Sequence, residues 1–324
     1  MYDIKKEPTD FIVEEIIDIT ESSGDYILVK MQKTNMNTLD ALDTISKHCN
    51  INVKEIGYCG LKDKNAVTIQ FISLPKKASI ANFEHEYIKL TPLHEIQRPL
   101  FIGNLVQNKF TITVHNIHDF EITQPKAMIN YFGEQRFSTD NEQIGRHIIK
   151  KEYLKAAQLL ARTQQRVQKA LALEPTNGPH AMQQLAPGLL GFFIHAYQSY
   201  LWNRGVSIYV KEYCETYTDD VLDIEIPKEG KQLAEKIFPL IGFSYDEDDY
   251  SQTISEIVTK LMDEEKISER NFIIKISRTL TKEGDKREIQ TPIENLHITG
   301  KSLTFTLNKG CYATVALRHI LLPK

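Results

Sequence analysis

The 324-residue chain lacks a long hydrophobic run, because charged residues interrupt its apolar stretches every few positions. Spanning a membrane takes about 18 or more apolar residues in a row, so we expect no membrane segment. The first residues, MYDIKKEPTDF, lack the apolar core of a secretory signal, so we expect a cytoplasmic protein. Hydrophobic residues make up 41% of the chain and charged residues 25%, which excludes a mainly disordered protein.

Cysteine and histidine are also scarce and scattered. The four cysteines form no Cys-x-x-Cys pair, and the ten histidines form neither His-x-x-x-His nor His-Glu-x-x-His. These spacings are the usual signatures of zinc sites and redox motifs. We therefore expect neither a metal centre nor a disulfide framework.

Charge is small in total but unevenly distributed. The whole chain carries −4, and the segment from Lys211 to Arg270 carries −10, which leaves +6 on the other 264 residues. A basic body favours binding of a polyanion, because positive side chains release its counterions. A solvated acidic surface without a partner explains the same distribution equally well.

Hydrophobic periodicity predicts strands at both ends of the chain and helices in the middle. The predicted strands are 11–17, 26–31, 66–74, 109–114, 303–307 and 311–320. The predicted helices are 38–49, 141–173, 189–210 and 251–262. This order predicts an α+β fold, in which terminal strands share one antiparallel sheet and a mostly helical insertion interrupts them.

The most unusual stretch is Gly57–Lys64, GYCGLKDK. Its two glycines allow a tight turn, and Asp63 stands between Lys62 and Lys64. Nearby positive charges favour the ionised carboxylate, which is the form that a nucleophile or general base requires. An exposed polar turn with weak surface ion pairs explains the same residues, so the loop alone fits either interpretation.

Two further stretches combine aromatic and polar residues. Asn130–Phe137, NYFGEQRF, offers rings that stack on unpaired bases and amides that hydrogen-bond base edges. The same pattern fits a helix end capped by Gly133, with the aromatic side chains in the core. Lys309–Arg318, KGCYATVALR, fits either the start of a strand at a binding site or an ordinary core strand.

In this order, the motifs resemble the TruD family of tRNA pseudouridine synthases. Lys5–Glu15 is similar to the family's Lys-x-x-Pro-x-Asp-Phe-x-Val-x-Glu, and Gly60–Gln70 to its catalytic Gly-x-Lys-Asp-x-x-Ala-Val-Thr-x-Gln. Asn130–Phe137 matches Asn-Tyr-Phe-Gly-x-Gln-Arg-Phe throughout, and GCYATVALRH resembles the last motif. The departures are Ser138 for Gly, Cys311 for Ser, Tyr312 for Phe and His319 for Glu.

The resemblance implies a pseudouridine-synthase-like catalytic domain with an antiparallel sheet, formed by residues 1–153 and 296–324. A mostly helical α/β insertion domain, residues 154–295, interrupts it. The implied reaction isomerises uridine to pseudouridine, which needs no redox change and no group donor, so no cofactor and no metal are expected. The expected partner is tRNA, modified at position 13, and the absence of a heptad or apolar interface stripe favours a monomer.

The resemblance also implies the site residues. Asp63 is the expected catalytic aspartate, by attack on C1′ of the ribose or by removal of a proton from C2′, and Lys5 is its expected ion-pair partner. The target base must leave the stacked helix to enter an aromatic-lined cleft. The residues expected to bind substrate are Phe11, Lys62, Gln70, Asn130, Phe132, Arg136 and Tyr312. Arg318 is expected to bind either a phosphate or a carboxylate within the protein.

Two other functions stay open on the residues alone. A non-catalytic RNA-binding protein would use the aromatic and basic residues without needing Asp63, and the intact Gly60–Gln70 motif argues against it. A nucleoside glycosidase would combine Asp63 with a second carboxylate, such as Glu14 or Glu15, and would act on free nucleosides.

Overall fold

The computed structural model describes residues 2–19, 23–276 and 280–324, and divides into two compact units. The first unit consists of Met1–Lys126, Pro292–Ala313 and Ile320–Lys324, and the second of Ala127–Thr291 and Thr314–His319. Residues 127–153, which the sequence-based division gives to the catalytic domain, thus pack in the second unit. The domain boundaries themselves stay a prediction.

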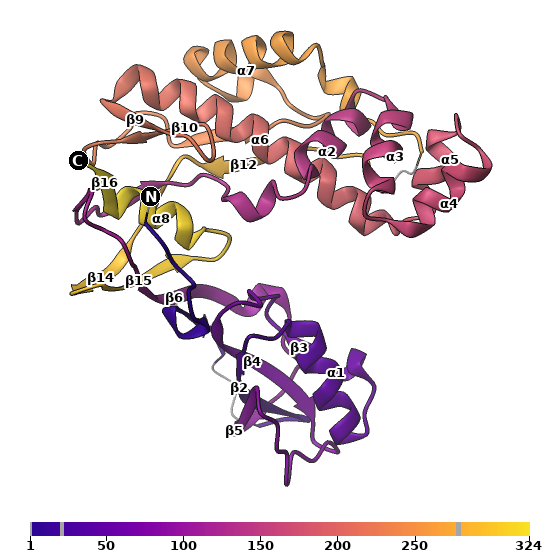
Figure 1. Ribbon diagram of the computed structural model, residues 1–324, viewed down its shortest axis with the longest axis vertical. Coiled ribbons are helices and arrows are strands. Elements are labelled where there is room, and N and C mark those ends of the chain that lie inside the picture. The colour runs from indigo at the N-terminus through magenta and orange to yellow at the C-terminus, as the bar shows by residue number, and fades with distance from the viewer. Residues whose placement is uncertain (1, 20–22, 277–279) are drawn as a thin grey trace. The chain divides into compact units, whose positions relative to one another are not determined.

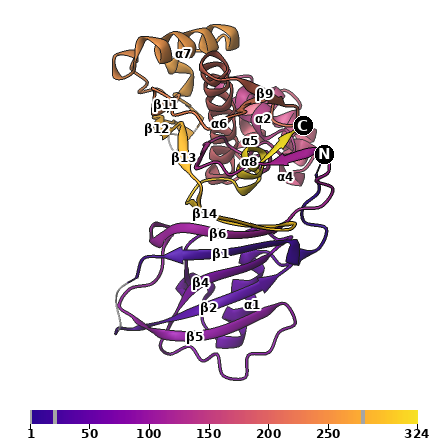
Figure 2. The same ribbon diagram turned by 90° about the vertical axis from the view of Figure 1, so that its left-hand side faces the viewer.

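The first unit is built on one mixed sheet. Its strands follow the order β14-β15-β6-β1-β4-β2-β5, with β3 paired to β4 (Figure 2). The strands are β1 (Phe11–Ile17), β2 (Tyr26–Thr34), β3 (Gly57–Tyr58), β4 (Val67–Pro75), β5 (Ile88–Ile96), β6 (Leu105–Thr113), β14 (Glu294–Thr299) and β15 (Ser302–Asn308). A separate short pair joins β7 (Phe120–Ile122) to β16 (Leu321–Pro323).

Helix α1 (Thr38–Cys49) covers one face of this sheet (Figures 1 and 2). Its residues Leu42 and Ile45 recur at helical spacing and pack in one buried cluster with Val29 and Ile72 from the sheet. Asn50 ends the helix in a left-handed conformation. The core of the first unit therefore lies between α1 and the centre of the sheet.

The prediction of a fully antiparallel sheet is wrong at one pair. Strand β4 is antiparallel to β2 along its whole length but parallel to β1, with Ile12 opposite Val67. Alternating side chains encode which face of a strand is buried, and that pattern is the same for either direction. The parallel pair has a consequence for the site, because the beginnings of β1 and β4 meet at the same end of the sheet.

The second unit is mainly helical. Its helices are α2 (Asn141–Ile149), α3 (Tyr153–Ala161), α4 (Gln165–Leu173), α5 (Gly178–Met182), α6 (Pro187–Tyr213), α7 (Gln252–Glu265) and most of α8 (Ala313–Ile320). Its short strands are β8 (Ala127–Ile129), β9 (Thr216–Asp219), β10 (Ile224–Pro227), β11 (Ile237–Leu240) and β12 (Asp285–Glu288), and β13 (Gln290–Pro292) begins in this unit. The predicted helical stretch 141–173 forms three helices rather than one. Lys151, with a positive φ of 61°, separates α2 from α3, and the extended Gln164 precedes α4.

Helix α6 is the centre of the second unit (Figure 1). Tyr197, Trp202 and Tyr209 on it are almost completely buried. Their buried polar atoms find partners inside the unit: the Trp202 ring N–H donates to the Phe238 carbonyl at 3.2 Å. A helix that is apolar on all sides has to be surrounded by other elements, and α6 packs against α2, α7, β10 and β11.

The predicted last strand, 311–320, is wrong. Residues Ala313–Ile320 form a helix, α8, and only β16 beyond it is extended. The side chains of Val315, Leu317 and Ile320 are buried, and the Arg318 guanidinium donates to the Thr314 carbonyl one turn earlier at 3.0 Å. Every residue from Val315 to Ile320 is buried, so burial shows no period that would distinguish a helix from a core strand in the sequence.

Candidate active site

Asp63 and Lys5 form an ion pair where β1 and β4 begin. The Lys5 Nζ lies 2.6 Å from the Asp63 carboxylate, and both side chains are about a quarter exposed. Lys5 precedes β1 and Asp63 precedes β4, so the parallel pairing of these strands brings the two residues together. The predicted ion pair is therefore present, and it leaves the carboxylate accessible to solvent.

The segment before β1 fixes the position of Lys5. Pro8 begins a short 3-10 helix, Pro8–Asp10, and the buried Asp10 carboxylate accepts a hydrogen bond from the Glu7 backbone N–H at 3.1 Å. Lys5 itself has a positive φ of 59°. Its Nζ also lies 4.0 Å from the centre of the Phe11 ring, so a cation–π contact supplements the ion pair.

Gln70 holds the loop before Asp63 from inside the protein. The Gln70 side chain is 1% exposed, and its amide N–H donates to the Gly60 carbonyl at 3.1 Å. Its amide oxygen accepts from the Thr38 hydroxyl at 3.1 Å, and that hydroxyl in turn accepts from the Lys62 backbone N–H at 3.0 Å. Gly60 has a φ of +142°, a conformation that suits glycine. The loop is thus tied down on both sides of Leu61.

Lys33 holds Asp63 by its backbone. The Lys33 side chain is fully buried, and its ammonium donates to the Asp63 carbonyl at 2.8 Å. Burial lowers the pKa of Lys33 to about 8, a shift that the nearby Asp63 charge opposes and the Lys62 charge reinforces. No motif pointed to this residue, because a lysine on a strand usually faces solvent.

Lys62 pairs with a buried carboxylate. Its Nζ lies 2.7 Å from Glu15, whose side chain is completely buried and also accepts from the Phe71 backbone N–H at 2.8 Å. A buried ion pair of this kind ties β1, β4 and the loop together. Glu15 is therefore occupied within the fold, and Lys62 is directed toward it.

Among the aromatic candidates of the first unit, Phe11 and Tyr312 differ in access. Phe11 is 3% exposed and packs edge-on against Phe110, with ring centres 6.1 Å apart. Tyr312 is half-buried and follows Gly310, whose φ of +81° turns the chain after β15. Phe11 is thus a wall of the Lys5–Asp63 site, whereas Tyr312 is only partly buried.

The second unit brings Asn130 and Phe132 together with an arginine that the sequence did not indicate. Arg287, on β12, donates to the Asn130 carbonyl and to its side-chain oxygen, the latter at 2.6 Å. Its guanidinium lies 4.1 Å from the centre of the Phe132 ring. The side chain of Asn203 makes reciprocal hydrogen bonds with the Phe132 backbone at 2.9 Å. No local pattern in DKRE distinguishes Arg287 from a surface residue.

The two arginines proposed for phosphate binding have different surroundings. Arg318 is buried and pairs with Glu134 at 2.7 Å and with Asp219 at 2.8 Å, so it serves carboxylates within the protein. Arg136 is half-buried, donates to the Ser199 hydroxyl at 3.2 Å and lies 5.2 Å from the centre of the Phe192 ring.

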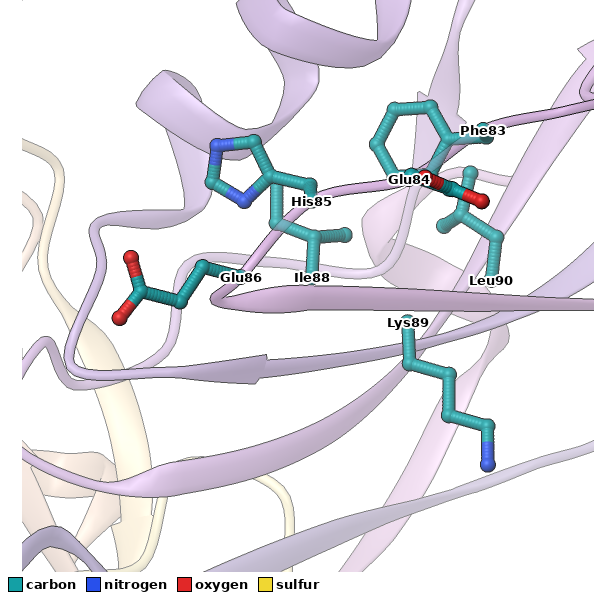
Figure 3. Close-up of a pocket in the computed structure, with 7 residues that line it drawn as sticks. All are labelled: Phe83, Glu84, His85, Glu86, Ile88, Lys89 and Leu90. Carbon is teal, nitrogen blue, oxygen red and sulfur yellow. The ribbon is translucent and has the colours of Figure 1, made fainter.

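The large pocket in Figure 3 is a different place. It has a volume of about 610 Å³ and is lined by Phe83–Glu86 and by Ile88–Leu90, at the edge strand β5. The charged ends of Glu84, Glu86 and Lys89 point in different directions (Figure 3). Binding sites usually have polar groups that converge, and none of the predicted site residues lines this pocket.

Within residues 2–19, 23–276 and 280–324, no three histidine, cysteine, aspartate or glutamate side chains gather as metal ligands would. In the same described part of the chain, every helix is too short or too polar to cross a bilayer.

A sequence profile of the family described as tRNA pseudouridine synthase D (TruD) matches residues 2–169 and 160–320. The chain belongs to this family. A protein of Methanocaldococcus jannaschii named probable tRNA pseudouridine synthase D 2 is 29% identical, over 98% of this chain and 91% of its own length. A tRNA pseudouridine synthase D of Aquifex aeolicus is 27% identical, over 98% of this chain and 97% of its own length.

A solved structure has the same fold. The crystal structure of a putative TruD protein from Methanosarcina mazei superposes with a TM-score of 0.71 and covers 98% of this chain and 92% of its own. Its identity of 22% makes this a statement about fold alone.

One departure from the TruD motifs has a structural explanation. His319, in the place where glutamate is usual, is buried in the second unit. Its Nε2 accepts from the Ile129 backbone N–H and its Nδ1 donates to the Val315 carbonyl, both at 3.0 Å. Burial lowers the pKa of His319 to about 4, so the ring is neutral and structural.

Proposed function

We propose that this TruD protein isomerises one uridine of tRNA to pseudouridine, with Asp63 as the catalytic aspartate. The observation that carries the proposal is the ion pair between Asp63 and Lys5, on a loop that Gln70 and Lys33 hold in place. Asp63 stands in the family's catalytic motif, and its carboxylate is the accessible acid of this loop.

The reaction needs an ionised carboxylate beside the ribose. The bond between N1 and C1′ breaks, the uracil turns, and a bond between C5 and C1′ forms, while C5 loses a proton and N1 gains one. Asp63 either attacks C1′ or takes a proton from C2′, and each role requires the anion. Lys5 stabilises that anion directly, because its ammonium group contacts the carboxylate.

Phe11, Lys62 and Gln70 are assigned here to positioning. Their side chains are nearly buried, and each contacts Lys5, Glu15 or the loop. Tyr312 is assigned to stacking on the flipped base, since it is half-buried beside a turn. Asn130 and Phe132 are also buried, at 6% and 7% exposed, so they are assigned to positioning Arg287, which contacts both.

The two alternatives have less support. A nucleoside glycosidase that used Glu15 would have to free a buried carboxylate from Lys62 and from the Phe71 N–H. Glu14 lies 3.9 Å from Lys30 on the solvent side of β1. A non-catalytic RNA-binding protein gives no reason for a loop held at Gly60, Lys62 and Asp63.

The test is to incubate the protein with an unmodified tRNA transcript, without cofactor or metal, and to map pseudouridine by carbodiimide-blocked primer extension. We expect one stop at uridine 13 and none after that uridine is replaced by cytidine. Free uridine is the control, and its turnover would favour the glycosidase. Unmodified tRNA that is bound but not converted would favour the RNA-binding protein.

A further inference from the structure

A basic cavity lies at the start of α6 in the second unit, and no role has been given to it so far. Its volume is about 350 Å³. It is lined by Arg136, Pro187, Gly188, Gly191, Phe192, His195 and Lys282. The three titratable residues come from three different segments, and none of these lining residues is acidic. Positive side chains that lie together repel one another, and a bound anion removes that repulsion. Such clusters of cations are therefore common at anion-binding sites.

Two permanent cations lie at the wall of this cavity, and Arg136 is the one that other side chains hold in place. The Lys282 Nζ would lie 3.5 Å from a Cβ placed on Gly191, so it stands over the second turn of α6. Arg136 is fixed by its hydrogen bond to Ser199 and by the Phe192 ring. A cation that is already oriented loses little freedom when an anion binds.

Positive charge in the cavity is not neutralised by Lys282's surroundings. Within the described residues the Lys282 ammonium has no carboxylate within ion-pair distance, whereas Lys286, four residues on, pairs with Asp249 at 3.1 Å. Desolvation, followed by the charges of Lys282 and Arg136, lowers the pKa of His195 to about 4. The imidazole is therefore neutral and adds no charge to the cavity. The first turn of α6 adds backbone dipoles of the same sign.

We propose that this cavity binds a phosphodiester group of the tRNA backbone through Lys282 and Arg136. The inference rests on the proposed function, which supplies a polyanionic substrate. The acidic segment 211–270 of the same unit carries −10 and repels RNA. A local cluster of cations is therefore needed wherever this unit contacts the RNA. Lys282 is new as a substrate contact, and Arg136 gains a defined partner.

The test measures tRNA binding by Lys282→Met, Lys282→Arg and the matched control Lys286→Met, which removes the same charge four residues away. We expect Lys282→Met to bind roughly tenfold more weakly near 0.15 M salt. Its plot of log affinity against log salt should be shallower by about one. Lys282→Arg should keep both values, and Lys286→Met should keep the slope. Equal losses in the Lys282→Met and Lys286→Met variants would overturn the proposal.

Gly191→Glu is a second variant, which keeps both cations of the cavity. The Cβ of the new side chain would lie 3.5 Å from the Lys282 Nζ, and its carboxylate should form an ion pair with that ammonium, so tRNA binding should weaken as in Lys282→Met. Inorganic phosphate, followed through the His195 ring signals by NMR, distinguishes the sources of the anion. A response to phosphate with unchanged tRNA binding in both variants would mean a free phosphate and would refute the RNA contact. Wild-type protein that binds tRNA but forms no pseudouridine would instead refute only the proposed function.

Discussion

The substitution Gln70→Met separates a residue that holds the loop from one that touches the substrate. Methionine has a similar length but cannot hydrogen-bond the Gly60 carbonyl or the Thr38 hydroxyl. The hydroxyl of Thr68, 3.4 Å from the same amide oxygen, loses an acceptor too. The variant therefore keeps the packing of β4 and releases the loop before Asp63.

The expected size of the effect follows from these three contacts. Each intramolecular hydrogen bond contributes about 1 kcal/mol net, so the free energy of unfolding should fall by about 3 kcal/mol. A displaced loop also moves the carboxylate, and a misplacement of about 1 Å can cost about a hundredfold in rate. We therefore expect kcat to fall by about tenfold to a hundredfold.

The assay is single-site pseudouridine formation at saturating tRNA, together with tRNA affinity and urea unfolding. Gln107→Met is the matched control, since Gln107 hydrogen-bonds Glu294 and Asn308 on the same sheet but not the loop. It should lose stability and keep kcat. Because Gln70 is 1% exposed, its variant should bind tRNA as the wild type does. A Gln70→Met enzyme with unchanged kcat and much weaker tRNA binding would refute the reasoning and make Gln70 a substrate contact.

Three further outcomes follow from the structure. Lys5→Met should lower kcat far more than tRNA affinity, and Lys5→Arg should restore part of the rate. A Lys5→Met enzyme with the wild-type rate in single-turnover assays would count against a catalytic role of the ion pair. Since the pKa of Lys33 is lowered to about 8, kcat should decline above about pH 8, and Lys33→Met should lack this decline. The free energy of unfolding should rise between about pH 8 and 10.5, because only the unfolded chain keeps the Lys33 proton in that range. The pKa of His319 is about 4 in the folded protein and 6.5 in the unfolded chain, so acid favours the unfolded chain. The free energy of unfolding should fall by about 2 kcal/mol between pH 7 and pH 5, and urea titrations of His319→Gln should lack this fall.

Much of the first unit was predictable because its signals are local. Alternation located β1, β2 and β4, and the spacing of Leu42 and Ile45 located α1. The charges around Asp63 led to the expectation of an ionised carboxylate, and the Lys5 partner came from the family motif. What could not be predicted was the direction of β4 relative to β1, because burial patterns do not encode strand direction.

The contacts of the site that sequence reasoning did not anticipate join residues that are distant in the chain. Gln70 has the residue type of a base-reading amide, but its partner Thr38 lies 32 residues away and draws it inward. Lys33 and Arg287 carry no motif, and only the fold brings them to Asp63 and Asn130. Long-range register decides such contacts, and a single sequence gives no direct signal of it.

The measurement that tests the central claim most directly is the single-turnover rate of Asp63→Asn on tRNA, with enzyme in excess. Asparagine keeps the shape of the side chain and removes the anion that Lys5 pairs with. The account predicts a rate lower by at least about a thousandfold, with tRNA affinity and urea midpoint close to those of the wild type. Pseudouridine formation within tenfold of the wild-type rate would contradict it, because the reaction would then not depend on the Asp63 carboxylate.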